Sequence, residues 1–137
     1  MRFLILALML LLLPLTSAQA QAYRAENLLI VVPLGGTTFE VIESRGEGPR
    51  GIWCAAASFA IHALRTPRAE RLYVKTPRGP SVSGVGRTSV VFTTDPAGIV
   101  ARDTYSPSLR QAGQTLPVHH AYQFCKDYQF ELEDIFP

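Results

Sequence analysis

The sequence has only two cysteines, Cys54 and Cys125, among its 137 residues. A single intramolecular disulfide is therefore the most that the chain can form. It also lacks a strong charge of either sign, because 13 Lys and Arg oppose 11 Asp and Glu, for a formal net charge of +2. So weak a basic balance argues against a nucleic-acid-binding protein.

Long apolar runs are absent after residue 20, so no transmembrane segment is expected in the chain that follows. Nucleotide-binding motifs are absent too. The loop over residues 78–87, RGPSVSGVGR, lacks the Lys-Ser/Thr of a P-loop and the three-glycine pattern of a dinucleotide site. The histidines at positions 62, 119 and 120 have no carboxylate at ligand spacing. We therefore expect no metal and no cofactor.

The first twenty residues have the pattern of an export signal. Met1 and Arg2 form a short positive region, residues 3–15 are almost entirely apolar, and small residues occupy Ala18 and Ala20. This order of charge, apolar run and small residues is typical of a secretory signal peptide. We predict a signal peptide over 1–20, cleaved after Ala20, and a periplasmic or secreted protein.

The remaining residues, 21–137, have a length that suits one domain with its own core. Alternating apolar residues bounded by glycine and proline predict strands, and alanine-rich or three-and-four-residue apolar spacing predicts helices. The predicted strands cover 28–32, 37–43, 71–75 and 88–94, and the first two form a hairpin. Short strands at 99–100 and 105–109 are further options. The predicted helices cover 53–65 and 115–127.

The second predicted helix has Thr115 as its cap and Pro117 in its first turn. The segments 21–27 and 128–137 are expected to be loosely held. The fold class is thus α+β, a small single domain with a short antiparallel sheet of four or more strands and two helices joined by one disulfide.

Cys54 and Cys125 have two interpretations. In an exported protein an even number of cysteines is expected to oxidise, and a disulfide between these two would join the predicted helices. The alternative is a thiol amidase or peptidase. A cysteine at the start of a helix, with His119 or His120 as base, resembles papain-like and cell-wall amidase families, and this resemblance would make Cys54 the nucleophile. Those families usually carry a polar residue before the cysteine, where this chain has Trp53.

The loop over 78–87 is the one place where the sequence suggests a ligand. Arg78 and Arg87 flank a glycine-rich segment whose backbone N–H groups could cradle an anion. The competing interpretation is a hairpin loop whose arginines maintain solubility and prevent edge pairing of the neighbouring strand.

Several short motifs also resemble a group of small exported bacterial proteins of unknown function. They are Trp53-Cys54-Ala-Ala-Ala, Gly79-Pro80-Ser81-Val82 before TSVVFTTDP, and Phe124-Cys125. The resemblance implies export and implies no activity. The sequence therefore favours a non-enzymatic binding or structural protein of the cell envelope, with an envelope or extracellular partner that it does not identify.

Overall fold

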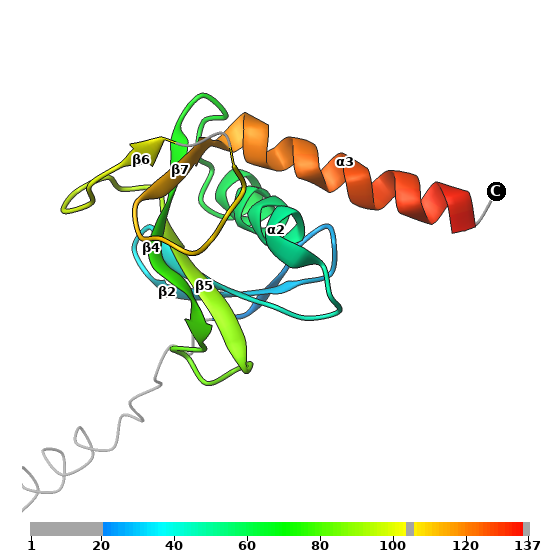
Figure 1. Cartoon of the computed structure of the whole chain (residues 1–137), viewed down its shortest axis with the longest axis horizontal. Coiled ribbons are helices and arrows are strands. Elements are labelled where there is room, and N and C mark those ends of the chain that lie inside the picture. Colours follow the sequence, from blue (N-terminus) through cyan, green and yellow to red (C-terminus); the bar gives the residue numbers. More distant parts are fainter. Residues whose placement is uncertain (1–20, 104–105, 136–137) are drawn as a thin grey trace, which may run out of the picture.

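The computed structural model describes residues 21–103 and 106–135. The predicted signal peptide and Tyr105, within one of the optional strands, lie outside these residues. Figure 1 shows a curved sheet packed against the helices. The strands are β1 (Tyr23–Arg24), β2 (Ile30–Gly35), β3 (Thr38–Ile42), β4 (Arg71–Pro80), β5 (Thr88–Thr93), β6 (Arg102–Asp103) and β7 (Gln114–Pro117). The helices are α2 (Gly48–His62) and α3 (Val118–Ile135).

The strands form a seven-stranded sheet in the order β1-β2-β3-β5-β4-β7-β6. Every neighbouring pair is antiparallel except β6 and β7, which are parallel. The hairpin predicted from the sequence is confirmed as β2 and β3, which turn at Gly35 and Gly36 with φ values of 112° and 56°. Such positive φ values are accessible to glycine without strain. The predicted α+β class is also confirmed.

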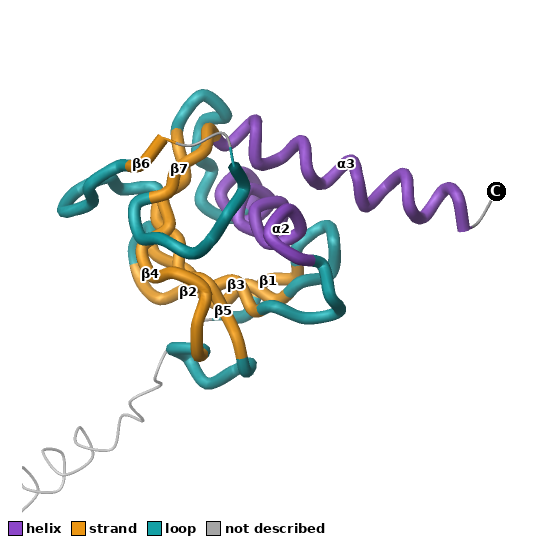
Figure 2. The backbone as a smooth tube through the Cα atoms, in the orientation of Figure 1, coloured by secondary structure: helices purple, strands orange, loops and turns teal. Residues whose placement is uncertain are grey.

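Helix α2 packs on the concave face of the sheet and α3 lies against the other side of α2 (Figure 2). Because α2 is covered on both sides, every residue from Gly51 to Ala60 is buried. Trp53 and Phe59 fill the layer below it, with ring centroids 5.0 Å from Phe92 and 4.6 Å from Phe39, respectively. The alanines of α2 let the neighbouring layers approach closely.

A disulfide joins the two helices. Cys54 and Cys125 are bonded, with Cα atoms 5.0 Å apart, and their side chains are 0% and 2% exposed. The predicted pairing is therefore confirmed. None of the helices in the described part of the chain is long and apolar enough to cross a membrane.

The structure corrects the predicted helix boundaries. Helix α2 begins at Gly48 rather than at 53, because Pro49 is compatible with the first turn of a helix. It ends three residues before the predicted position 65, at His62. The predicted helix over 115–127 begins only at Val118, because Leu116 pairs with Leu72 of β4 and its segment becomes strand β7. Long-range pairing thus overrides the local helix signal of Thr115 and Pro117.

Regular structure extends into both segments that were expected to be loosely held. Tyr23 and Arg24 form β1, and Ala25 and Asn27 are 3% and 1% exposed, so the segment 21–27 joins the sheet and core. Helix α3 continues to Ile135, where the sequence suggested a loose segment over 128–137. Among the optional strands, residues 99–100 form none, and neither do residues 106–109, the described part of the second; the short strand β6 lies between them.

Candidate functional site

The β4–β5 loop, residues 81–87, is held by a buried carboxylate. Glu40 lies on β3 and is 0% exposed, and its Oε1 accepts hydrogen bonds from the Ser81 hydroxyl at 2.9 Å and from the Val82 N–H at 2.7 Å. Its Oε2 accepts one from the Ser83 N–H at 3.3 Å. The Ser89 hydroxyl also donates to Oε1. The loop is thus folded around Glu40.

The loop serines and β5 keep Glu40 charged. Burial alone would raise the pKa of this carboxyl group. The hydrogen bonds from Ser83, Ser89 and Ser81, together with that from the Val82 N–H, outweigh burial and hold the pKa below its ordinary value of 4.5. Glu40 is therefore a buried anion whose charge is satisfied by hydrogen bonds.

This arrangement corrects one part of the sequence prediction. The backbone N–H groups of Val82 and Ser83 were candidates to cradle an external anion, but they donate to Glu40 instead. The Ser81 N–H donates to the carbonyl of Arg87 at 3.0 Å. The loop does bind an anion through its backbone, and that anion is part of the same chain.

Arg78 forms an ion pair with a carboxylate of the same chain. Its Nε and Nη2 donate to the two carboxylate oxygens of Glu43 at 2.6 and 2.8 Å. The hydrogen bonds with Glu43 and the charge of that carboxylate raise the pKa of Arg78 above its ordinary value. Because this pair is bidentate, it fixes the guanidinium in place and cancels its charge.

A third arginine reaches the same surface from a distant segment. The segment 106–110 is tied to the core at two points, since the Trp53 indole N–H donates to the Pro107 carbonyl at 2.9 Å and the Arg78 N–H donates to the Leu109 carbonyl at 2.9 Å. Leu109 itself is 2% exposed. These contacts place Arg110, which follows Leu109, next to Arg78.

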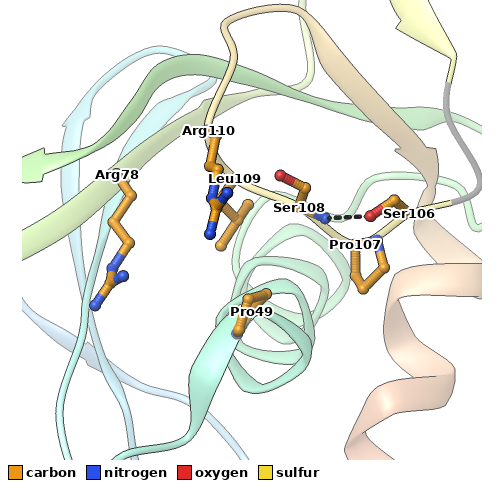
Figure 3. A pocket seen from close by; sticks show the side chains of 7 residues that line it. All are labelled: Pro49, Arg78, Ser106, Pro107, Ser108, Leu109 and Arg110. Carbon is orange, nitrogen blue, oxygen red and sulfur yellow. Dashed lines mark hydrogen bonds between the residues drawn. The ribbon is translucent and has the colours of Figure 1, made fainter.

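Figure 3 shows the side chains of Arg78 and Arg110 extending in the same direction over Pro49, the first turn of α2. They line a hollow of about 570 Å³ together with Ser106, Pro107, Ser108 and Leu109. A second, more open hollow of about 510 Å³ is lined by Arg78, Arg87 and Arg110 together with Gly79, Pro80 and Thr88. We call these two adjoining hollows the arginine cleft.

The three arginines of the arginine cleft differ in whether a carboxylate pairs with them. Within the part of the chain that the structure describes, no carboxylate pairs with Arg87 or Arg110, whereas Glu43 neutralises Arg78. Both unpaired side chains belong to exposed residues. The cleft thus offers two free guanidinium groups, each able to donate two parallel hydrogen bonds to a phosphate, sulfate or carboxylate.

The alternative catalytic residues are not brought together. Cys54 lies inside α2, six residues after Gly48, and its sulfur is bonded to Cys125. His119 and His120 lie in the first turn of α3 and are exposed, about 8–9 Å along the helix from Cys125. A buried, bonded sulfur is not available as a thiolate nucleophile, so the site of the alternative thiol-hydrolase interpretation lacks its reacting atom in this structure.

The three histidines contact different residues and do not form a cluster. His119 Nδ1 lies 3.0 Å from the Arg68 carbonyl, and His120 packs at 5.8 Å from the ring of Phe124. His62 lies 3.4 Å from Glu26. Among the residues that the structure describes, no group of three or more His, Cys, Asp or Glu side chains could hold a metal ion.

Two residues of this site were missed from the sequence. Arg110 is far from the loop in sequence, and only the contacts of Trp53 and Arg78 bring it there. Glu40 alternates with Phe39 and Val41, a pattern that indicates a solvent-facing side chain. The signal against that interpretation is Ile42, which shares the face of Glu40 and is 7% exposed.

Comparison with protein-family models, with curated proteins and with solved structures found no match for this chain.

Proposed function

We propose that the protein is an exported, disulfide-linked binding domain that recognises an anionic group of an envelope or extracellular component through the arginine cleft. The observation that carries this proposal is the convergence of Arg87 and Arg110, both without a carboxylate partner in the described chain, on one hollow beside Arg78. Arg78, which lines the same hollow, is already paired with Glu43.

The chemistry of the cleft favours an oxyanion with several acceptor oxygens. A guanidinium donates two parallel hydrogen bonds to a phosphate or carboxylate, and two such groups near each other suit a ligand with more than one charge. The Ser108 side chain lines the same cleft and offers a hydroxyl donor. Since the segments that carry Arg87 and Arg110 are held by hydrogen bonds, binding requires ordering of the two side chains and little ordering of the backbone.

Two observations support an exported location. The bond between Cys54 and Cys125 is consistent with an oxidising compartment. The order of charge, apolar run and small residues over 1–20 is typical of a signal peptide. An enzymatic role through Cys54 is not proposed, because its sulfur is bonded.

The test measures binding of tripolyphosphate to the mature chain by calorimetry at low salt. The double variant Arg87→Ser/Arg110→Ser should bind at least about tenfold more weakly, because two charge-assisted contacts are lost. Arg78 is left intact, since removing it would leave Glu43 unpaired.

The matched control is Arg24→Ser/Lys126→Ser, which removes the same charge from exposed positions on β1 and α3. It should bind like the parent, because at distant sites the two charges contribute only a screened, long-range attraction. If both double variants lost the same affinity for tripolyphosphate, binding would depend on net charge alone and not on the arginine cleft. A parent that does not bind tripolyphosphate would refute the proposal.

A further inference from the structure

We infer that the arginine cleft and the tip of the β4–β5 loop together dock on an anionic phospholipid surface. In this arrangement Val82 and Val85 enter the interface between headgroups and acyl chains, and Arg87 and Arg110 contact lipid phosphates. The inference rests on the proposed function, since it names the source of the anion that the cleft recognises.

The first observation is the exposure of two aliphatic side chains on one short loop. Val82 is 57% exposed and Val85 is 59% exposed. The remaining large hydrophobic residues that are exposed in the described chain, Leu34, Val100 and Ile135, lie on separate segments. The β4–β5 hairpin also projects from the body of the domain (Figure 1), so its tip can meet a flat surface first.

The second observation is that the tip has a fixed shape. Glu40 accepts hydrogen bonds from the loop backbone at Val82 and Ser83. Gly86 is pressed against β3, because a Cβ at this position would lie 2.3 Å from the Ile42 side chain. The loop thus keeps Val82 and Val85 exposed to solvent on a backbone that is already held in place. Binding therefore costs little backbone entropy.

The third observation is the charge beside the valines. Arg87 lies two residues after Val85, and Arg110 lines the hollow that Arg87 borders. Apolar side chains next to unpaired cations are the combination by which peripheral proteins bind anionic bilayers. A soluble polyanion would use the arginines alone and would leave the exposed valines without a role.

The test is sedimentation of the mature protein with vesicles at low salt. One vesicle preparation is phosphatidylcholine alone, and the other is phosphatidylcholine with a minority of phosphatidylglycerol. The parent should bind the second preparation and not the first. The variant Val82→Ser/Val85→Ser should bind the anionic vesicles about tenfold more weakly, because it loses two buried aliphatic contacts. Its affinity for tripolyphosphate should equal that of the parent.

A matched control removes two exposed aliphatic side chains elsewhere. Leu34→Ser/Val100→Ser should bind anionic vesicles like the parent, since these residues lie on β2 and in the segment before β6. Equal vesicle binding by the parent and by Val82→Ser/Val85→Ser would overturn the inference. So would a parent that binds tripolyphosphate but neither vesicle, and that result would leave the arginine cleft as a site for soluble anions.

Discussion

Glu40 is the residue on which the geometry of the β4–β5 loop depends. It is fully buried on β3, and each of its carboxylate oxygens accepts hydrogen bonds from that loop or from β5. A buried carboxylate with several donors around it stabilises a fold only while it is ionised and all of its partners are in place. The loop that carries Val82 and Val85 and leads to Arg87 is held by this contact.

We predict that Glu40→Gln lowers the free energy of unfolding by about 1–3 kcal/mol at neutral pH, because the amide NH₂ would face donors in place of an acceptor. The folded pKa of Glu40 is lowered, so its contribution is complete above the unfolded value of 4.5 and is lost as pH falls through the folded pKa. The deficit of the variant relative to the parent should therefore shrink in acid.

Urea unfolding of parent and variant at neutral pH and below the unfolded pKa of Glu40 measures this. Glu70→Gln is the control, since Glu70 is exposed and its hydrogen bonds are made by its backbone, the N–H donating to the Pro67 carbonyl and the carbonyl accepting from the Val118 N–H. This control should leave stability unchanged to within about 0.5 kcal/mol. A deficit for Glu40→Gln that stays constant down to low pH would contradict the ionised, hydrogen-bonded state.

At the scale of elements, the position of α3 is set by contacts at several points. Strand β7 leads directly into it, and the first N–H groups of the helix, at Val118 and His119, donate to the carbonyls of Glu70 and Arg68. The disulfide at Cys125 then ties the helix to α2. Figure 1 shows that the later turns of α3 extend past α2. The disulfide therefore adds a covalent link to the packing between α2 and α3.

We predict that Cys54→Ala/Cys125→Ala lowers the free energy of unfolding by about 2–5 kcal/mol, because the bond closes a loop with a sequence separation of 71 residues and constrains the unfolded chain. Chemical denaturation with and without a reductant measures this. The parent should lose stability on reduction, and the variant should not respond to the reductant. A parent midpoint that is the same in both conditions would mean that the bridge contributes nothing.

At the scale of the whole molecule, the domain is a stack of three layers, with α2 buried between the sheet and α3 (Figure 2). At the projecting end of the sheet, Arg87 and Arg110 line one hollow without a carboxylate partner in the described chain, while the carboxylates of Glu40 and Glu43 accept hydrogen bonds from the same chain. A binding role at this end of the molecule requires that the protein reaches an envelope or extracellular partner. Export is the step that would bring it there.

We predict that protein recovered from the periplasm or medium begins at Gln21 or within a residue or two of it, because Ala18 and Ala20 suit signal peptidase. Mass determination of the intact exported chain measures this. Replacing Ala18 and Ala20 by bulky residues should leave a precursor uncut, which is the matched control. An exported chain that retains Met1 would contradict the prediction and weaken the case for an oxidising compartment.

Much of the fold was determined by local sequence. Period-two alternation identified β3, β4 and β5, because it reports which face of a strand is buried. A short β-branched run identified β2, and alanine-rich sequence identified α2. The pairing of Cys54 with Cys125 followed from there being only two cysteines. Arg78 and Arg87 were recognised as neighbours because one short loop separates them.

The tertiary structure alone decided the rest. Pairing with β4 made residues 114–117 a strand in spite of their helix-start signals. Because both faces of β3 are buried, the Glu40 carboxylate lies inside the protein and accepts hydrogen bonds from the loop. Glu43 forms an ion pair with Arg78. Arg110 joined the cleft through contacts with residues far away in the chain. Side chains from distant segments meet only when the chain folds, so no local pattern could indicate which charges would pair and which would remain free.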